Sequence, residues 1–329
     1  MQKREYAFDI LRVISMALVV VIHVSNVYSR SFGIISNKQF LGSLFFNTTA
    51  RVSVPIFFMI SGALLLDRKF DRKKYIKRII KFLILIVVWD IIYLLWEYYF
   101  LGITYDKLYM LLIQPYRAHL WFLYTILLLY LVQPILKKVL YKTDKKIKIV
   151  LLIIWITLST ISIVNNTIAQ VFTIFSHMGY FIIGKYLYDY AKKKYSREYN
   201  PLLVSSTIAA ITISVTLNYI YSIKYHMFYN LFFAYRTPFI MVASMAIYTL
   251  VIANYKKEHL SKFITILSSM SLGVYLIHGI FLDITIKYFA YQEINSLLGI
   301  TGFSLIILIC SLMSVYLIKK TKVLSFLVE

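Results

Sequence analysis

The chain has 329 residues, of which 60% are hydrophobic and 17% aromatic, and its formal net charge is +22. A soluble domain of this length cannot bury so large an apolar fraction, so we expect an all-α polytopic membrane protein without a sizeable soluble domain. The positive charge does not indicate nucleic acid, because it is concentrated in short loops between apolar stretches. The single cysteine, Cys310, excludes a disulfide framework and a thiolate metal site.

Ten apolar stretches are each long enough to cross a hydrocarbon core of about 30 Å. The first follows a short basic N-terminus and has no small-residue cleavage site after it, so we interpret it as an uncleaved span. The predicted architecture is one transmembrane domain over residues 1–329, with no appended soluble domain. The ten predicted spans are residues 6–29, 41–66, 76–100, 119–136, 148–164, 170–190, 202–222, 231–254, 264–289 and 301–318.

Basic residues alternate between the loops on the two sides of these spans. The termini and the even-numbered connections carry 27 of the 36 lysines and arginines, the opposite loops carry 5, and the remaining 4 fall within spans. The positive-inside rule therefore predicts that both termini are cytoplasmic, in a bacterial cytoplasmic membrane. Most of these charges need no role beyond topology and contact with anionic lipid. The dense cluster Arg68–Arg78 could also hold the phosphates of an anionic cofactor.

The first span carries a polar stripe. Arg12 and His23 are eleven positions apart, which at about 100° and 1.5 Å per residue places them on one face, about 16 Å apart along the axis. Asp9 and Asn26 share that stripe. Ionisable groups at membrane depth are costly and usually mark a functional cavity, although a buried network that only packs the span is the alternative.

The chemistry of the stripe favours a catalytic interpretation. A neutral imidazole at position 23 can accept a proton from a hydroxyl group. The guanidinium of Arg12 stays charged at any depth and presents a planar fork to phosphate or carbonyl oxygens. A pair with Asp9, three residues earlier, would offset the cost of burying that charge. We predict His23, Arg12 and Asp9 as the catalytic group.

The second span reads Arg51-Val-Ser-Val-Pro-Ile-Phe-Phe-Met-Ile-Ser-Gly62. Pro55 lacks an amide proton, so it should kink the helix about one turn after Arg51. Ser61 and Gly62 should allow a ligand or a neighbouring helix to come close, and helix packing is the favoured interpretation for Gly62.

Further candidates lie in later spans. His119 and Trp121 open the fourth span, where tryptophan is usually an interfacial anchor but could also stack on a sugar. His278, near the middle of the ninth span, precedes Asp283 and Lys287, which we expect to pair. Asp90 and Glu97 share a face of the third span and should look inward, without an assignable role. The predicted substrate-binding residues are His119, Trp121, Arg236, Tyr275 and His278.

Several chemistries have no support in the sequence. There is no Walker loop, no dinucleotide-binding glycine pattern, no zinc-protease motif and no Gly-x-Ser-x-Gly context. ATP-driven transport and a serine-hydrolase mechanism are therefore not indicated, and we expect no metal.

Four of these segments, taken together and in order, resemble the membrane acyltransferase 3 family. They are Asp9-Ile-Leu-Arg12 with His23, Ser53-Val-Pro-Ile-Phe-Phe-Met-Ile-Ser-Gly62, His119-Leu-Trp-Phe-Leu, and Ser271-Leu-Gly-Val-Tyr-Leu-Ile-His278. The resemblance runs from residue 4 to about residue 290. The stretches Arg51–Leu64 and His119–Pro134 are most similar to the O-acetyltransferase type that decorates enterobacterial common antigen.

The resemblance implies transfer of an acyl group, most often acetyl, from cytoplasmic acetyl-CoA to a hydroxyl of a cell-surface polysaccharide or its lipid-linked precursor. It implies that His23 is catalytic and that Arg12 supports it or the donor. The donor-side candidates are Arg51, Ser61, Arg72, Lys77 and Arg78. Direct transfer and an acyl-histidine relay both remain open.

Two other classes of function are compatible with ten spans and inward charges. A transporter or flippase for a lipid-linked sugar predicts glycan that fails to reach the surface when the protein is absent. A non-catalytic scaffold predicts that Arg12→Lys is harmless. The acyltransferase predicts glycan that reaches the surface without its ester.

Overall fold

The structure is a computed structural model that describes residues 4–102, 115–163, 166–255, 261–321 and 324–328. The side chains at 145 and 166–174 lie outside that description, as does residue 164 at the end of the fifth predicted span. The described residues form helices and connecting turns, and no strand is found among them. The all-α prediction is therefore confirmed.

The α-helices are α1 (Tyr6–Arg30), α2 (Asn37–Ala50), α3 (Ser53–Leu66), α4 (Arg72–Trp96), α5 (Trp121–Lys142), α6 (Lys145–Ile161), α7 (Asn166–Lys193), α8 (Asn200–Tyr225), α9 (Pro238–Asn254), α10 (Lys262–Ser269), α11 (Ser271–Tyr288) and α12 (Ser296–Lys320). A π-helical turn, η1 (Glu97–Leu101), extends α4, and short 3₁₀ turns are η3 (Ala118–Leu120), η4 (Arg197–Tyr199), η5 (Leu231–Phe233), η6 (Tyr291–Glu293) and η7 (Ser325–Leu327).

Each of the ten predicted spans falls on a helix or on two consecutive helices. By length and composition, 7 helical segments in the described chain could cross a membrane, and α10 with α11, bent by 63°, makes up to 8. The helices α6 and α7 are not among these segments. Multiple membrane spans are thus supported, while the number ten and the cytoplasmic placement of both termini stay predictions.

The second predicted span is interrupted close to its proline, although α2 and α3 together still form one candidate span, Asn37–Leu66. Helix α2 ends at Ala50, and α3 begins at Ser53, two residues before Pro55. Because Pro55 has no amide proton, the carbonyl of Arg51 loses the partner that a regular helix would give it. The interruption falls on Arg51 and Val52, whose backbone angles stay helical, and the amide of Arg51 still donates to the carbonyl of Asn47 at 3.1 Å.

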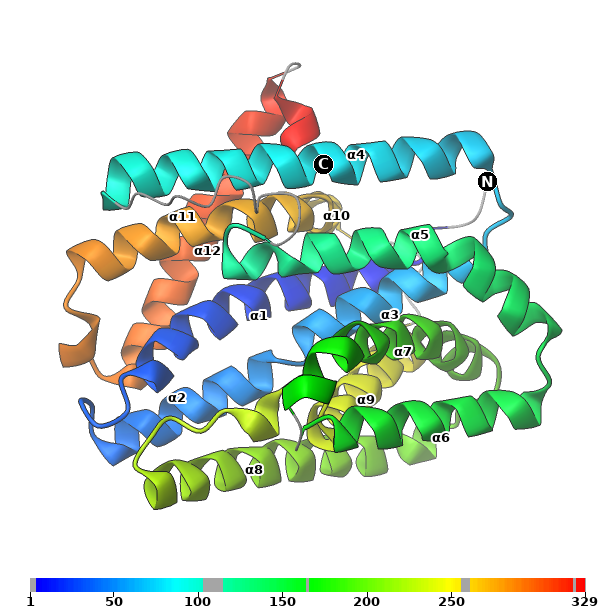
Figure 1. Cartoon of the computed structure of the whole chain (residues 1–329), viewed down its shortest axis with the longest axis horizontal. Helices are drawn as coiled ribbons and strands as arrows, with labels where there is room; N and C mark the ends of the chain where they lie inside the picture. Colours follow the sequence, from blue (N-terminus) through cyan, green and yellow to red (C-terminus); the bar gives the residue numbers. More distant parts are fainter. Residues whose placement is uncertain (1–3, 103–114, 164–165, 256–260, 322–323, 329) are drawn as a thin grey trace.

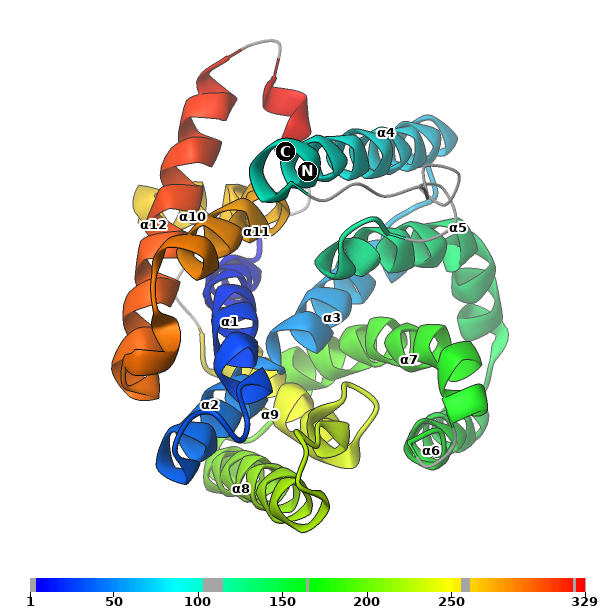
Figure 2. The ribbon, with the colours of Figure 1, turned by 60° about the vertical axis from the view of Figure 1, so that its left-hand side comes forward.

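Helix α1 lies inside the bundle, between α3 on one side and α11 and α12 on the other (Figure 1, Figure 2). It also contacts α2, α9 and α10. More than half of its most apolar window is buried inside the protein. A polar stripe on this helix is consequently held against other protein segments, as the sequence predicted.

Glycines bring α3 and α7 into close contact. A Cβ atom on Gly62 would lie 1.6 Å from the carbonyl oxygen of Phe181, and one on Gly184 would lie 2.2 Å from that of Met59. Small residues at such contacts let two backbones approach, which is a common way to pack helices in membranes. The helix-packing interpretation of Gly62 is confirmed, and this contact holds α3 beside the site.

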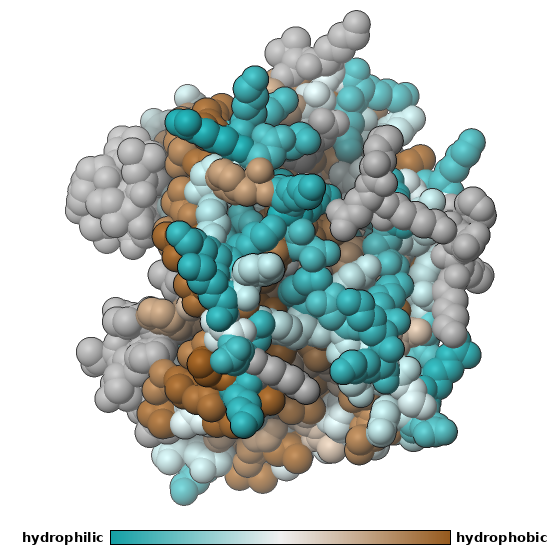
Figure 3. Space-filling model, turned by 90° about the vertical axis from the view of Figure 1, so that its right-hand side faces the viewer, coloured by the Kyte–Doolittle hydropathy of each residue, from teal (hydrophilic) through white to brown (hydrophobic). Residues whose placement is uncertain are grey.

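The basic connections meet at one end of the bundle, which we call the basic end. Lys137 donates to the carbonyl of Arg68, Lys185 pairs with Asp67 at 3.1 Å, and Lys192 pairs with Glu5 at 3.0 Å. These contacts tie the N-terminus to the ends of α3, α5 and α7. Figure 3 looks onto this end, where hydrophilic side chains are gathered. The positive-inside rule predicts this end to be cytoplasmic.

Candidate functional site

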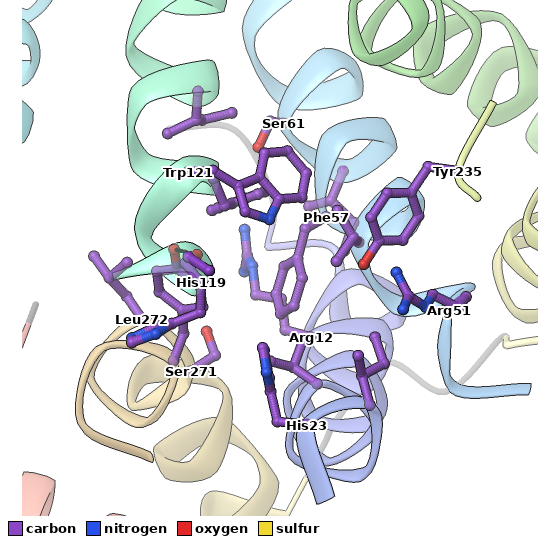
Figure 4. Close-up of a pocket in the computed structure, with 18 of the residues that line it drawn as sticks. Arg12, His23, Arg51, Phe57, Ser61, His119, Trp121, Tyr235, Ser271 and Leu272 are labelled. Atoms are coloured by element: carbon purple, nitrogen blue, oxygen red, sulfur yellow. Dashed lines mark hydrogen bonds between the residues drawn. The ribbon is translucent and has the colours of Figure 1, made fainter. Parts of the chain in front are cut away.

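A cavity of about 460 Å³ lies beside α1, within the bundle, and we call it the chamber. Its lining combines three polar or charged groups from α1, the arginine at the α2–α3 break and a wall of aromatic rings (Figure 4). Among its lining residues are Arg12, His23, Asn26, Arg51, Phe57, Ser61, Phe82, His119, Trp121, Phe122, Tyr130, Tyr235, Ser271 and Tyr275. No carboxylate belongs to the described lining, so the chamber carries positive charge.

The stripe on α1 faces the chamber as the eleven-residue spacing predicted. Arg12, His23 and Asn26 all line it. His23 and Arg12 are only partly buried by protein, because their polar ends point into the cavity (Figure 4). A partly buried imidazole beside two guanidinium groups can accept a proton from a bound hydroxyl, and the guanidinium groups can stabilise a developing negative charge.

Asp9 lies at the base of the stripe and outside the chamber lining. Its buried carboxylate accepts from Arg4 at 2.7 Å, from Ser268 at 2.7 Å and from Arg12 at 3.3 Å. These bonds saturate the carboxylate and offset the cost of burying it. The geometry thus gives Asp9 the role of holding Arg12, and places it away from any reacting atoms in the chamber.

Arg51 enters the chamber from the break between α2 and α3. Its Nε donates to Oδ1 of buried Asn47 at 2.9 Å, and its guanidinium carbon lies 4.6 Å from the ring centre of Phe233 and 5.3 Å from that of Tyr235. No carboxylate pairs with it among the described residues. Arg51 lies near enough to His23 to act on it electrostatically, so it belongs with the imidazole and not with the basic cluster that the sequence had grouped with it.

A second pocket opens at the basic end, and we call it the basic mouth. It is lined by Leu65, Arg68, Lys69, Phe70, Asp71, Lys74, Tyr75, Arg78 and Gln133. The N-terminal residues of α4 supply part of it because Asp71 caps that helix, accepting from the Lys74 amide at 3.1 Å. This amide bond is the main reason that the pKa of Asp71 is lowered.

Tyr130 lies at the boundary of the two pockets. It lines the chamber, and the guanidinium of Arg78 from the basic mouth lies 5.4 Å from its ring centre. Ser61, Arg12 and Arg68 all lie close enough to the hydroxyl of Tyr130 to act on it. The two pockets therefore adjoin where Arg78 of the basic mouth contacts Tyr130 of the chamber.

The predicted donor-side residues divide accordingly. Arg78 lines the basic mouth and Ser61 lines the chamber next to it. Arg72 and Lys77 are exposed on α4 and line neither pocket. Lys77 directly precedes Arg78 but points about 100° away around the helix, so charge density in the sequence could not tell which basic residues point inward.

Three imidazoles from three segments of the chain converge beside the chamber. The ring centres of His23 and His278 are 4.9 Å apart, those of His119 and His278 are 5.1 Å apart, and those of His23 and His119 are 5.9 Å apart. His119 lines the chamber, whereas His278 lies behind His23 and is buried. The structure thus brings His278 to the predicted catalytic histidine and not to the chamber wall where a substrate would touch it. No group of side chains that could hold a metal ion is found among the described residues.

The other predicted substrate-binding residues are partly brought together. Trp121 and Tyr275 line the chamber, and the ring of Trp121 lies 5.8 Å from that of Tyr235. The hydroxyl of Tyr275 donates to the backbone carbonyl of His119 at 2.6 Å, which fixes the η3 turn. Arg236 does not line the chamber, although its neighbour Tyr235 does. Phe57, Tyr130 and Tyr235 were not singled out, since no spacing distinguishes them among the chain's many aromatic residues.

The prediction that Asp283 pairs with Lys287 is wrong. Asp283 pairs with Arg117 and accepts from Trp96 Nε1 at 3.0 Å, while Lys287 donates to the carbonyl of Phe100 at 2.6 Å. Neighbours four residues apart on a helix gain only about 0.2–0.5 kcal/mol, and a partly buried arginine from another segment outcompetes that pairing.

The third-span acids look inward as expected, but each has its own partners. Glu97 pairs with Arg117 at 2.7 Å. Asp90 accepts from the amide of Tyr116 at 3.0 Å and from the hydroxyl of Tyr124. Arg117 thereby joins α4 and α11 to the turn that carries His119.

Residues 5–317 match the family model described as an acyltransferase domain, Acyl_transf_3. The match covers nearly the whole chain, and the chain belongs to the acyltransferase 3 family. The comparisons with curated proteins and with solved structures found no match. Family and fold together define a membrane acyltransferase.

Proposed function

We propose that the protein is an integral-membrane O-acetyltransferase that moves an acetyl group from cytoplasmic acetyl-CoA to a hydroxyl of a cell-surface or capsular polysaccharide, or of its lipid-linked precursor. The observation that carries this proposal is the chamber. It places an imidazole, two guanidinium groups and an aromatic wall inside a bundle of apolar helices, next to a basic mouth at one end. We place the protein in the bacterial cytoplasmic membrane with both termini in the cytoplasm.

The donor enters from the basic end in this account. Arg68, Lys69 and Arg78 in the basic mouth would hold the phosphate groups of coenzyme A, since arginine and lysine bind phosphate through charge-assisted hydrogen bonds. The thioester would reach the chamber past the wall formed by Tyr130 and Ser61. Arg12 would meet its carbonyl oxygen, because the guanidinium faces the cavity while Asp9 holds it from below.

His23 would perform the chemical step in one of two ways. As a general base it takes the proton from the acceptor hydroxyl, the hydroxyl oxygen bonds the acetyl carbon, and the carbon–sulfur bond breaks. The proton then passes from the imidazolium to the departing thiolate, which leaves as free coenzyme A. In the relay version an imidazole nitrogen bonds the acetyl carbon first, the carbon–sulfur bond breaks, and the thiolate leaves with the proton of the other imidazole nitrogen. The acceptor oxygen then bonds the acetyl carbon, the carbon–nitrogen bond breaks, and the hydroxyl proton returns to the imidazole. In both versions Arg12 and Arg51 offset the charge of the tetrahedral oxyanion.

The acceptor would enter from the opposite side of the chamber. Trp121, Tyr235 and Tyr275 present aromatic faces there, and such faces stack on the apolar side of sugar rings. His119 and Asn26 supply hydrogen-bonding groups for hydroxyls. This arrangement supports a carbohydrate acceptor over an acyl chain, which would need no polar partner.

The experiment that tests the proposal is an NMR comparison of cell-surface glycan from cells with and without the gene. Loss of an alkali-labile acetate from glycan that still reaches the surface is the expected result, and the spectrum also reports the sugar and the position. Glycan that carries the same esters in both strains contradicts the proposal and favours a non-catalytic protein. Glycan that stays inside the cells when the gene is absent also contradicts it and favours a flippase.

A further inference from the structure

One buried histidine beside His23, His278, has a fixed and identifiable tautomer. Nδ1 of His278 lies 2.6 Å from the carbonyl oxygen of Tyr275 and 3.2 Å from that of Val274. A carbonyl oxygen can only accept, so Nδ1 of His278 must carry the proton. Its Nε2 is then a lone-pair acceptor, and it has no hydrogen-bond partner in the structure.

His119 approaches His278 from another segment, with its ring centre 5.1 Å from that of His278. Its Nε2 also has no hydrogen-bond partner. Both rings are more than nine-tenths buried, His119 at 9% exposure and His278 at 1%. Gly279 leaves space for the cluster, because a Cβ atom there would come within 2.9 Å of Cε1 of His119.

An unpartnered acceptor in a dry site is costly, about 1–3 kcal/mol each, unless a donor arrives during function. The donor at hand is His23, whose ring centre lies 4.9 Å from that of His278 and 5.9 Å from that of His119. Hydrogen bonds of catalytic groups are often long without substrate and tighten in the reacting complex. Arg51 and Arg117 are the charged groups that act on His23, and a guanidinium has no lone pair that could accept a hydrogen bond. The neighbouring imidazoles are neutral and can accept one.

We propose that His278, assisted by His119, is the positioning residue for His23, and accepts through Nε2 the N–H of His23 that faces away from the substrate. The inference rests on the proposed function. In the neutral state this bond fixes the tautomer of His23, so that its other nitrogen holds the lone pair toward the chamber. When that nitrogen takes the acceptor's proton, both N–H bonds of the imidazolium have partners. No proton moves to His278, and the proton on His23 leaves with the thiolate of coenzyme A.

Two substitutions at the same position separate this role from simple packing. Asparagine places an amide N–H where Nδ1 stood, so His278→Asn keeps the bond to Tyr275 and removes the acceptor. Glutamine places a carbonyl oxygen near the position of Nε2, so His278→Gln keeps the acceptor. The readout is release of free coenzyme A from acetyl-CoA by isolated membranes, which supply the glycan acceptor, with kcat and KM measured separately. Thermal unfolding of the purified protein is the folding check.

The proposal predicts that His278→Asn lowers kcat about 100-fold, with an unchanged KM for acetyl-CoA, while His278→Gln keeps kcat within about tenfold of the wild type. The same pair at His119 should show a smaller difference in the same direction. Equal losses for Asn and Gln at position 278, or an Asn variant with wild-type kcat, would overturn it. The proposed function is judged separately, by whether wild-type protein consumes acetyl-CoA and His23→Ala does not.

Discussion

The guanidinium of Arg12 is bonded to the carboxylate of Asp9 one turn earlier on α1, at 3.3 Å, and faces the chamber with the rest of its donors. The carboxylate of Asp9 thus holds the guanidinium of Arg12 in place and leaves most of its N–H donors available. Arg4 bonds the same carboxylate at 2.7 Å but lies half-exposed at the basic end and lines no part of the chamber.

This difference gives a matched pair of substitutions. Arg12→Lys should lower acetyl transfer by at least tenfold, because lysine cannot hold Asp9 and the thioester oxygen at the same time. Arg4→Lys should stay within about twofold of the wild type, since lysine keeps a cation beside Asp9 and residue 4 lines no part of the chamber. Transfer of labelled acetyl from acetyl-CoA in membranes measures both. A harmless Arg12→Lys would favour a scaffold over an enzyme.

The basic mouth should determine donor affinity. Arg78→Met removes a lining charge, so the KM for acetyl-CoA should rise about tenfold with little change in kcat, since the phosphates are remote from the reacting atoms. Lys77→Met, one residue earlier and exposed, is the control and should leave both constants unchanged. Initial rates over a range of acetyl-CoA concentrations decide the matter. Equal effects of the two variants would show that only net charge matters.

The contact between α3 and α7 should be sensitive to a single methyl group. Gly62→Ala places Cβ 1.6 Å from a backbone oxygen, so the two helices must separate, at a cost of about 1–3 kcal/mol or more. Gly302→Ala on α12 is the control, because no heavy atom lies within 4 Å of a Cβ there. We expect the unfolding temperature of purified protein to fall by several degrees for Gly62→Ala only. Similar unfolding temperatures for both variants would contradict the packing.

The ion-pair cluster around Arg117 should support the structure. Arg117→Met leaves the buried carboxylate of Glu97 and the partly buried one of Asp283 without a cation, and breaking such a pair costs about 3–5 kcal/mol. Lys287→Met removes an exposed bond to a backbone carbonyl and a contact 4.2 Å from the ring centre of Phe100, and should cost about 1–2 kcal/mol. Chemical denaturation of the solubilised protein compares them. Equal free energies of unfolding for the two variants would show that the ion-pair cluster does not stabilise the protein.

The sequence predicted the features that depend on helical periodicity. Arg12, His23 and Asn26 share one face of α1, and that face lines the chamber. It also predicted that the histidine and tryptophan opening the fourth span belong to the site. Periodicity within one helix carries these predictions, because a polar stripe in an apolar helix must be covered by other protein segments.

The remainder depends on contacts between distant segments. The partner of Asp283 is Arg117 and not Lys287, and Arg51, between α2 and α3, lines the same chamber as His23. His278 meets His23 because α11 packs against α1. None of these pairings has a signal in local spacing, since each is decided by which helix packs beside which.

The central claim is that His23 transfers acetyl from a donor that enters at the basic end. It is tested most directly with inverted membrane vesicles that expose the cytoplasmic side and are given acetyl-CoA labelled in the acetyl group. Wild-type vesicles should place alkali-labile label on the glycan fraction, and vesicles with equal amounts of folded His23→Ala should place none. Label transfer at the wild-type rate by the His23→Ala protein would contradict the account.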